Sequence, residues 1–209
     1  MNIYKLKRII FMLLAVIGMG FGLSWLIPCG FGTDCCSALN LAVSKKLGMS
    51  FGNWQALLNI LLFLVILPLD RKQIGWGTLG NMLLVGYSCD FFNWLWDHVL
   101  PADLFLLLST RILIAIPALL FFVLAAAIYM DMDLGVAPYD ALAFILYHKV
   151  LKEKYSFRTI RIGYDLTVVL LGYLFGAPFA AITLAMAFLL GPAVTAVGNR
   201  LIPLLRLNK

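Results

Sequence analysis

The sequence predicts an all-α, polytopic membrane protein with about six transmembrane helices and two short helices that are re-entrant or interfacial. Two observations support this fold class. The chain has 209 residues, of which 63% are hydrophobic and only 12% are charged, whereas soluble domains average about 45–50% and about 25%. The hydrophobic residues also form blocks of roughly 20 residues, the length of a helix that crosses about 30 Å of hydrocarbon. We therefore expect a single membrane domain over residues 1–209.

The long apolar blocks define the predicted spans in chain order. They cover residues 9–27, 54–69, 74–96, 104–129, 160–175 and 178–197. The first block follows Lys5, Lys7 and Arg8, as the apolar region of a signal peptide would. It is 19 residues long, however, and such regions usually have about 7–15 residues. We therefore expect it to be retained as the first span.

Two shorter helical segments, residues 34–47 and 138–151, each follow a glycine-containing stretch. At 1.5 Å per residue, helices of this length reach only about 21 Å, less than the thickness of the hydrocarbon core. The two segments also align with each other, residues 32–39 over 135–142. The same register, after a small insertion, places Ser50 over Ser156, Gln55 over Arg161, Asn59 over Asp165 and Gly86 over Gly191. The pattern predicts two copies of one unit, residues 1–100 and 101–209.

The positions of the basic residues predict the orientation of the chain. Lys and Arg lie almost entirely in loops, which is the positive-inside pattern and places both termini in the cytoplasm. Charge does not decide whether the short helices cross the membrane. Lys45 and Lys46 are outside if the short helices do not cross, and Arg71 and Lys72 are outside if they do. Their length favours the first topology, with six spans and two inverted copies, as in many secondary transporters.

Several stretches of the first half resemble a known family. They are GFGTDCCSALNL at residues 30–41, LGMSFGNWQ at 47–55 and IGWGT at 74–78. In these stretches the chain is similar to the YczE/YyaS/YitT family of bacterial integral membrane proteins, and the similarity extends over nearly its whole length. Members commonly have proline where this chain has Cys35, whereas the second copy has Pro138. The resemblance implies a multi-pass protein of the bacterial cytoplasmic membrane and gives no substrate.

Composition and motifs exclude several classes of function. The net charge of +6 is distributed over loops, so it does not indicate binding of nucleic acid. No nucleotide-binding, hydrolase or dinucleotide-binding motif is present, so we expect neither enzymatic activity nor a cofactor. The cysteines lack the paired CxxC spacing of a metal site. A thiol redox function for Cys35, Cys36 and Cys89 is the weakest alternative, because adjacent cysteines form strained disulfides.

Polar residues within apolar blocks are the candidates for a binding site. An ionisable group at the centre of a membrane helix costs at least about 2.5–3.5 kcal/mol, and such groups often mark substrate or ion pathways. Asp165 is the strongest candidate, with Arg161 four residues earlier on the same helix face. The candidate substrate-binding residues are Asp34, Ser37, Asn59, Asn81, Asp90, Tyr139, Asp140, Arg161 and Asp165.

Each candidate also has a structural interpretation. Arg161 and Asp165 form a pair that could simply lock one helix. Asp34 and Asp140 lie at the starts of the short helices, where a carboxylate caps the helix; alternatively, these starts bind an anionic group of a substrate. Asp90 could belong to a polar stripe with Asn81, or only hydrogen-bond between helices.

Arg111 lies inside the fourth block and needs an acidic partner, with Asp90, Asp97 and Asp103 as candidates, or else extends to the membrane interface.

Two functions fit these features. The first is a small-solute transporter or permease with a polar site between the two copies. The second is a membrane scaffold or assembly factor that binds a cytosolic partner or anionic lipid through the basic loop 149–161. The expected partners are the lipid bilayer and an unidentified small solute, and the chain is a candidate homo-oligomer.

Overall fold

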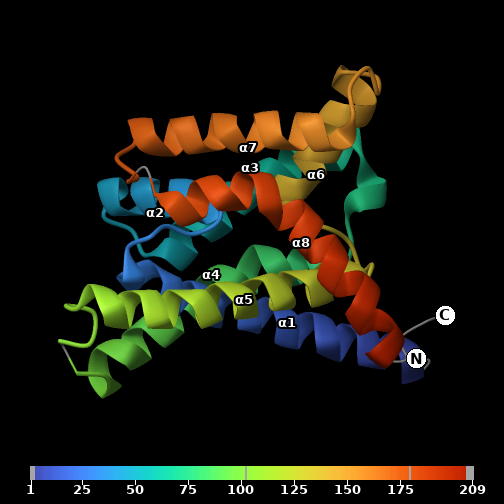
Figure 1. The fold of residues 1–209 in the computed structure, drawn as a ribbon. Helices are drawn as coiled ribbons and strands as arrows, with labels where there is room; N and C mark the ends of the chain where they lie inside the picture. Colours follow the sequence, from blue (N-terminus) through green and yellow to red (C-terminus); the bar gives the residue numbers. More distant parts are fainter. Residues whose placement is uncertain (1–2, 102, 179, 206–209) are drawn as a thin grey trace.

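A computed structural model describes residues 3–101, 103–178 and 180–205, and within these ranges the chain is entirely helical (Figure 1). The α-helices are α1 (Ile3–Cys29), α2 (Cys35–Leu47), α3 (Phe51–Leu69), α4 (Trp76–Val99), α5 (Leu108–Asp131), α6 (Pro138–Ile145), α7 (Phe157–Leu174) and α8 (Ala181–Leu205). A 3-10 turn, η1 (Arg71–Gln73), precedes α4, and a π-helical turn, η2 (Leu146–Val150), continues α6. The predicted all-α class is confirmed for the described part of the chain. The predicted copies 1–100 and 101–209 also contain residues 1–2, 102, 179 and 206–209, which lie outside the part of the chain that the structure describes.

Four helices within the described ranges are long and apolar enough to cross a membrane. They are Tyr4–Cys29, Phe51–Leu69, Leu108–Asp131 and Ala181–Arg200. The predicted third and fifth spans form helices of 24 and 18 residues, α4 and α7. They are less apolar than the other four because α4 carries Asn81 and Asp90, and α7 carries Arg158, Arg161 and Asp165. The count of six spans therefore stays a prediction.

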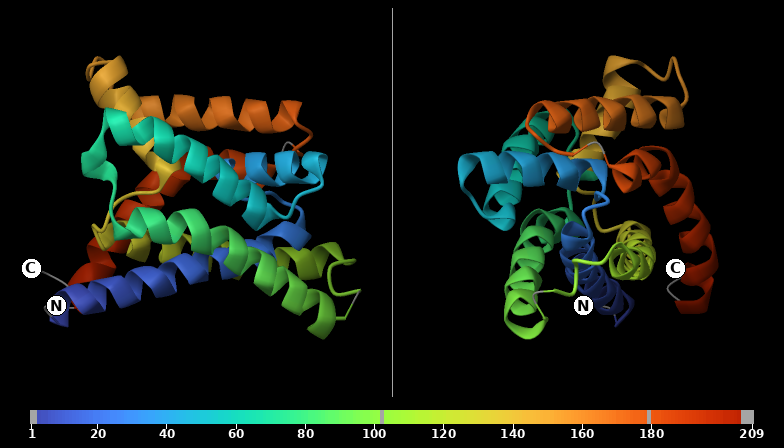
Figure 2. Two further views of the ribbon diagram at one scale, coloured as in Figure 1. Left: turned by 180° about the vertical axis from the view of Figure 1, so that it is seen from behind. Right: turned by 60° about the vertical axis from the view of Figure 1, so that its left-hand side comes forward.

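The helices form two layers joined by α8 (Figures 1 and 2). Helix α1 packs against α4 and α5 in one layer, and α2, α3, α6 and α7 form the other. Helix α8 begins beside α2 and α7 and ends beside α5. Val16, Leu23 and Leu26 of α1 are fully buried. Gly20 lies against the backbone of α4, and Gly22 lies against Phe122 of α5. These glycines permit the close helix packing that is common in membrane proteins.

The two short helices both start beside the middle of α7 and run toward opposite ends of it. At the start of α6, Tyr139 contacts Asp165, whereas further along Phe144 stacks on Phe157 at the beginning of α7, with ring centroids 4.7 Å apart. At the start of α2, Cys35 packs in one cluster with Tyr139 and Val168. At the end of α2, the Lys46 ammonium lies 5.4 Å from the ring centroid of Phe175. Each short helix therefore covers about half of α7.

The chain reverses before each short helix at a glycine in the left-handed region. Gly32 has φ +97° and Gly135 has φ +100°, values that only glycine adopts readily. A Cβ on Gly32 would overlap the Thr183 hydroxyl, and a Cβ on Gly135 would overlap the Thr78 hydroxyl. Backbone bonds support both reversals: Ile182 N–H donates to Phe31 O at 3.0 Å, and Gly77 N–H donates to Leu134 O at 2.7 Å.

Arg111 does not pair with any of the acids considered for it. Its Nε donates to the carbonyl of Cys29 at 2.6 Å, and its guanidinium lies 5.0 Å from the ring centroid of Phe31. Cys29 is the last residue of α1, where carbonyl groups lack partners within the helix. Arg111 therefore caps α1, an interaction that requires no carboxylate.

Candidate functional site

A pocket of about 670 Å³ lies between the two layers. Within the described chain, every α-helix from α1 to α8 contributes residues to its walls. Its volume lies in the range of about 300–1,000 Å³ that is typical of small-molecule sites. Of the nine candidate residues, all except Asp90 line it, namely Asp34, Ser37, Asn59, Asn81, Tyr139, Asp140, Arg161 and Asp165.

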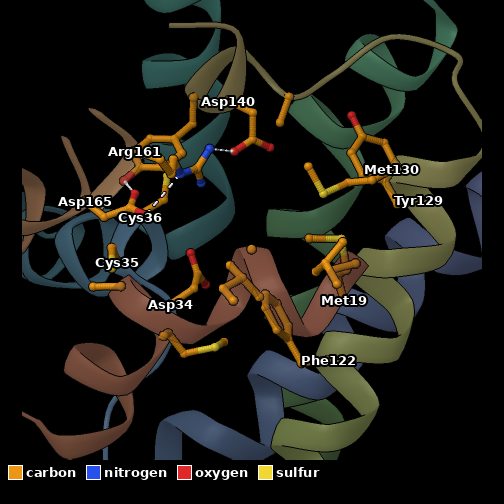
Figure 3. Close-up of a pocket in the computed structure, with 18 of the residues that line it drawn as sticks. Met19, Asp34, Cys35, Cys36, Phe122, Tyr129, Met130, Asp140, Arg161 and Asp165 are labelled. Carbon is orange, nitrogen blue, oxygen red and sulfur yellow. Dashed lines mark hydrogen bonds and ion pairs between the residues drawn. The ribbon is translucent and has the colours of Figure 1, made fainter. Parts of the chain in front are cut away.

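Arg161 is the centre of the polar wall (Figure 3). Its Nε donates to Asp165 Oδ2 at 3.0 Å, and its Nη1 donates to Asp140 Oδ1 at 2.6 Å. The side chains of Arg161, Asp140 and Asp165 are 19%, 16% and 5% exposed. Tyr139 donates its hydroxyl to the other oxygen of Asp165, Oδ1, at 2.6 Å. One guanidinium therefore joins two carboxylates of different helices, and both oxygens of Asp165 are used.

Local sequence explains why these groups meet. Arg161 and Asp165 are four residues apart, so they share one face of α7. Pro138 occupies the first turn of α6, where its missing N–H costs no hydrogen bond. Tyr139 and Asp140 follow in that first turn, and the reversal at Gly135 directs this end of α6 toward the middle of α7.

Asp34 caps α2 from the same wall of the pocket. Its Oδ2 accepts the backbone N–H of Ser37 at 3.1 Å, which is the expected helix-capping bond. Its Oδ1 is buried and has no hydrogen-bond partner among the described residues. The capping interpretation of Asp34 is thus correct for one oxygen and leaves the other unexplained.

Three amide side chains line the pocket from α3 and α4, and all are buried. Asn59 Nδ2 donates to the carbonyl of Met82 at 3.5 Å, and Asn81 is 6% exposed. Gln55 is also 6% exposed, and its Oε1 has no partner within the described chain. Sequence reasoning did not include Gln55 in the site. The internal alignment carried the signal, because it places Gln55 over Arg161.

The opposite wall of the pocket is apolar. Figure 3 shows Met19, Phe122, Tyr129 and Met130 across the pocket from Arg161, Asp165 and Asp34. Tyr129 directs its hydroxyl to the carbonyls of Gly77 and Gly135, both at 3.3 Å. These residues were not predicted, since apolar residues of a membrane helix give no sign of whether they face lipid or a pocket.

Asp90 lies away from the pocket. Its Oδ2 accepts the backbone N–H of Gly52 at 2.8 Å, near the start of α3. The expected stripe with Asn81 fails on geometry, because nine residues are two and a half helical turns and place the two side chains on opposite faces of α4. The interhelical hydrogen bond is therefore the interpretation that the structure supports for Asp90.

The side chains that line the pocket are suited to binding a ligand through hydrogen bonds and ionic contacts. The four cysteines are free thiols, and Cys35 and Cys36 line the pocket. In the described part of the chain, no group of three or more His, Cys, Asp or Glu side chains is placed to hold a metal ion. The arrangement offers one shared guanidinium, three carboxylates, amides and an apolar wall.

Comparisons with known proteins give relatives and a family. A family described as "Family of unknown function (DUF6198)" matches residues 6–199. The chain is 30% identical over 135 residues to the uncharacterized protein YyaS of Bacillus subtilis, which covers 64% of this chain and 65%, just under two thirds, of YyaS. It is 26% identical over 180 residues to the uncharacterized membrane protein YczE of the same bacterium, covering 84% of this chain and 78% of YczE. No solved structure matches the chain.

Proposed function

The chain belongs to the DUF6198 family and is a helical membrane protein related to YczE, and from this premise we propose that it transports a small solute across the bacterial cytoplasmic membrane. The observation that carries the proposal is the polar network of Arg161, which joins the start of α6 to the middle of α7 inside a pocket. Discontinuous helices that end near the membrane centre form the substrate sites of many secondary transporters.

Matched contacts in the two halves support the proposed inverted repeat. Each helix of the first half has a counterpart in the second half: α1 corresponds to α5, α2 to α6, α3 to α7 and α4 to α8. Under this correspondence, the contact of α2 with α7 matches the contact of α6 with α3. The contacts of α1 with α4 and of α3 with α4 likewise correspond to those of α5 with α8 and of α7 with α8. The glycine reversals match as well, Gly32 beside Thr183 and Gly135 beside Thr78.

The same arrangement favours six spans with the short helices re-entrant. In Figure 1 the start of α1 and the end of α8 lie at one end of the bundle, and the connections after α3 and α6 lie there too. Lys72 and Lys152 belong to these connections. On the positive-inside rule, our proposal is that this end of the bundle, and with it both termini, faces the cytoplasm.

Uptake into proteoliposomes tests the proposal. The purified protein would be reconstituted and exposed to a defined mixture of small amines, acids, amino acids and sugars, and the vesicle lumen analysed by mass spectrometry. We expect at least one compound to accumulate above protein-free vesicles. Asp165→Asn removes one of the two charges that hold Arg161, so we expect uptake to fall to the background level. Asp90→Asn, the matched change outside the pocket, retains uptake.

Two results would contradict this proposal. Uptake by Asp165→Asn equal to that of the unmodified protein would remove Asp165 from the mechanism. A folded protein that accumulates none of the compounds would favour a scaffold instead.

The scaffold function has one observation of its own. All residues from 148 to 156 are exposed, and Lys152 and Glu153 adopt positive φ angles of 46° and 60°. Such a loop presents its charges to a cytosolic partner or anionic lipid. Replacing Lys152 and Lys154 by Glu would abolish scaffold function and leave solute uptake unchanged.

A further inference from the structure

We infer that the pocket binds an organic cation, a protonated amine carried on an apolar body. The inference rests on the proposed function in that the same pocket is taken as the substrate site. It concerns the chemistry of the ligand, however, and is tested by binding alone.

Charge is the first argument. Among the described lining residues, Asp34, Asp140 and Asp165 are acidic, and Arg158 and Arg161 are basic. Arg158 is exposed, and the guanidinium of Arg161 already binds Asp140 and Asp165. Asp34 forms no ion pair within the described ranges. The deep part of the pocket thus holds three carboxyl groups and one guanidinium. With all of them ionised, the pocket has an excess of negative charge, which a bound monocation would stabilise.

Unused acceptors are the second argument. Asp34 Oδ1 and Gln55 Oε1 are buried without a hydrogen-bond donor among the described residues, and both side chains line the pocket. A buried acceptor without a partner costs roughly 1–3 kcal/mol. Because Gln55 is 6% exposed, its carbonyl has little access to bulk water. A primary ammonium group brings three donors and a positive charge. It would satisfy these acceptors once either side chain rotates its buried oxygen into the pocket.

The apolar wall is the third argument. Met19, Phe122 and Met130 line the side opposite Asp34 and Arg161 (Figure 3). Methionine and aromatic side chains pack against hydrocarbon or aromatic groups, and aromatic rings also attract cations. A pocket of about 670 Å³ with one acidic and one apolar wall fits a ligand that has a charged head and an apolar body better than it fits a bare metal ion.

An anionic ligand is disfavoured by the same residues. The starts of short helices bind anions through free backbone N–H groups. At α2, Asp34 already takes the N–H of Ser37. At α6, Pro138 has no N–H to offer, and Asp140 stands beside it. The arrangement therefore favours a cationic ligand over the anionic group that was the alternative expectation for these helix starts.

Calorimetric titration of the purified protein in a neutral detergent tests the inference, with detergent alone as the blank. Benzylammonium is the cationic probe, and benzyl alcohol and benzoate are neutral and anionic compounds of similar shape. We expect saturable binding of benzylammonium and no binding of benzoate. Benzyltrimethylammonium, which keeps the charge and lacks N–H donors, should bind at least about tenfold more weakly.

Two variants assign the binding to the two acceptors. Asp34→Asn removes the charge and retains a good helix cap, and Gln55→Leu removes the amide at similar volume. Each should raise the Kd of benzylammonium at least about tenfold, the factor that corresponds to about 1.4 kcal/mol. Asp90→Asn is the matched control and should leave the Kd within about twofold. The melting temperature of each variant shows that it is folded.

The outcomes separate this inference from the transport proposal. Binding of benzylammonium that depends on Asp34, without uptake of any amine, supports the ligand class and contradicts transport. Preferential binding of benzoate overturns the ligand class, and so do equal Kd values for benzylammonium, benzyl alcohol and benzoate. Either result leaves transport to be decided by the uptake experiment. Saturable benzylammonium binding that is unchanged in both variants also overturns it.

Discussion

Arg161 is the residue on which the polar wall depends. It lies between Asp140 and Asp165 and is only 19% exposed. Its planar guanidinium presents donors in fixed directions, so one side chain serves two carboxylates at once. Removing one member of such a group leaves a charge in a partly buried place, which is more costly than removing both.

A double-mutant cycle measures this dependence. Arg161→Gln leaves Asp140 and Asp165 without their cation, and we expect a loss of about 3–5 kcal/mol in the free energy of unfolding. Adding Asp165→Asn to Arg161→Gln should recover part of that loss, because one unpaired charge disappears. Unfolding in a single detergent gives all four values. If the two single losses simply add in the double variant, the pair has no energetic coupling and the network does not stabilise the site.

Spacing within one helix predicted some of the site, and contacts between helices account for what it missed. The spacing of four positions from Arg161 to Asp165 was enough to predict their pairing. The position of Tyr139 beside Asp165 depends on where α6 begins. Tyr139 was among the candidate binding residues predicted from the sequence, but no partner was predicted for it. Gln55 was missed because an uncharged amide in an apolar block does not stand out. Asp90 was included because its position inside an apolar block does not reveal the direction in which its side chain points.

The two reversals that precede α2 and α6 set the positions of both helix starts. In each, a glycine with positive φ lies against a threonine near the beginning of a long helix, Thr183 of α8 or Thr78 of α4. A side chain at either glycine would strain the backbone and also push that long helix away. The starts of the short helices are thereby fixed relative to α4 and α8.

Alanine at these glycines tests that role. Gly32→Ala and Gly135→Ala should each cost about 1–2 kcal/mol in backbone strain and a further ~1–3 kcal/mol in overpacking, seen as a lower melting temperature. Gly163→Ala is the matched control: Gly163 is in α7 with open space around it, so alanine there should be neutral or slightly stabilising. Equal melting temperatures for all three variants would show that the reversals tolerate a side chain.

Hydropathy located each of the long helices, but some ends differ by more than one turn: α1 begins at Ile3 rather than at residue 9, and α8 ends at Leu205 rather than at residue 197. Two of the helix starts that it missed have local causes. Blocks predicted to start at residues 54 and 160 begin at Phe51 and Phe157. Ser50 and Ser156 cap these helices by accepting the N–H groups of Asn53 and Thr159. A capping serine and the first helical turn are polar, so an apolar average excludes them.

At the scale of the whole molecule, the side of the membrane on which each loop lies distinguishes inverted copies from parallel copies. The end of α2 and the end of η2 lie at opposite ends of α7 in the structure. A re-entrant α2 therefore places Lys45 on the outer side of the membrane and Lys152 on the cytoplasmic side. A crossing α2 would place both residues in the cytoplasm.

Cysteine labelling in intact cells distinguishes the two cases. In a background without the four native cysteines, Lys45→Cys should react with a membrane-impermeant maleimide added outside, and Lys152→Cys should react only after lysis. Both positions are exposed, so burial does not prevent the reaction. Protection of Lys45→Cys in intact cells, followed by reaction after lysis, would contradict six spans and inverted copies.

The polar wall differs between the two halves, and this difference has an evolutionary consequence. Where α7 carries Arg161 and Asp165, α3 carries Gln55 and Asn59. A symmetric dimer of half-length chains uses the same residues twice, so it would place either two ion pairs or two amide pairs around the pocket. If the two halves are copies of one unit, as we propose, one half could keep the charges while the other became neutral only after the gene for that unit had been duplicated. On that proposal, the asymmetric site is younger than the duplication.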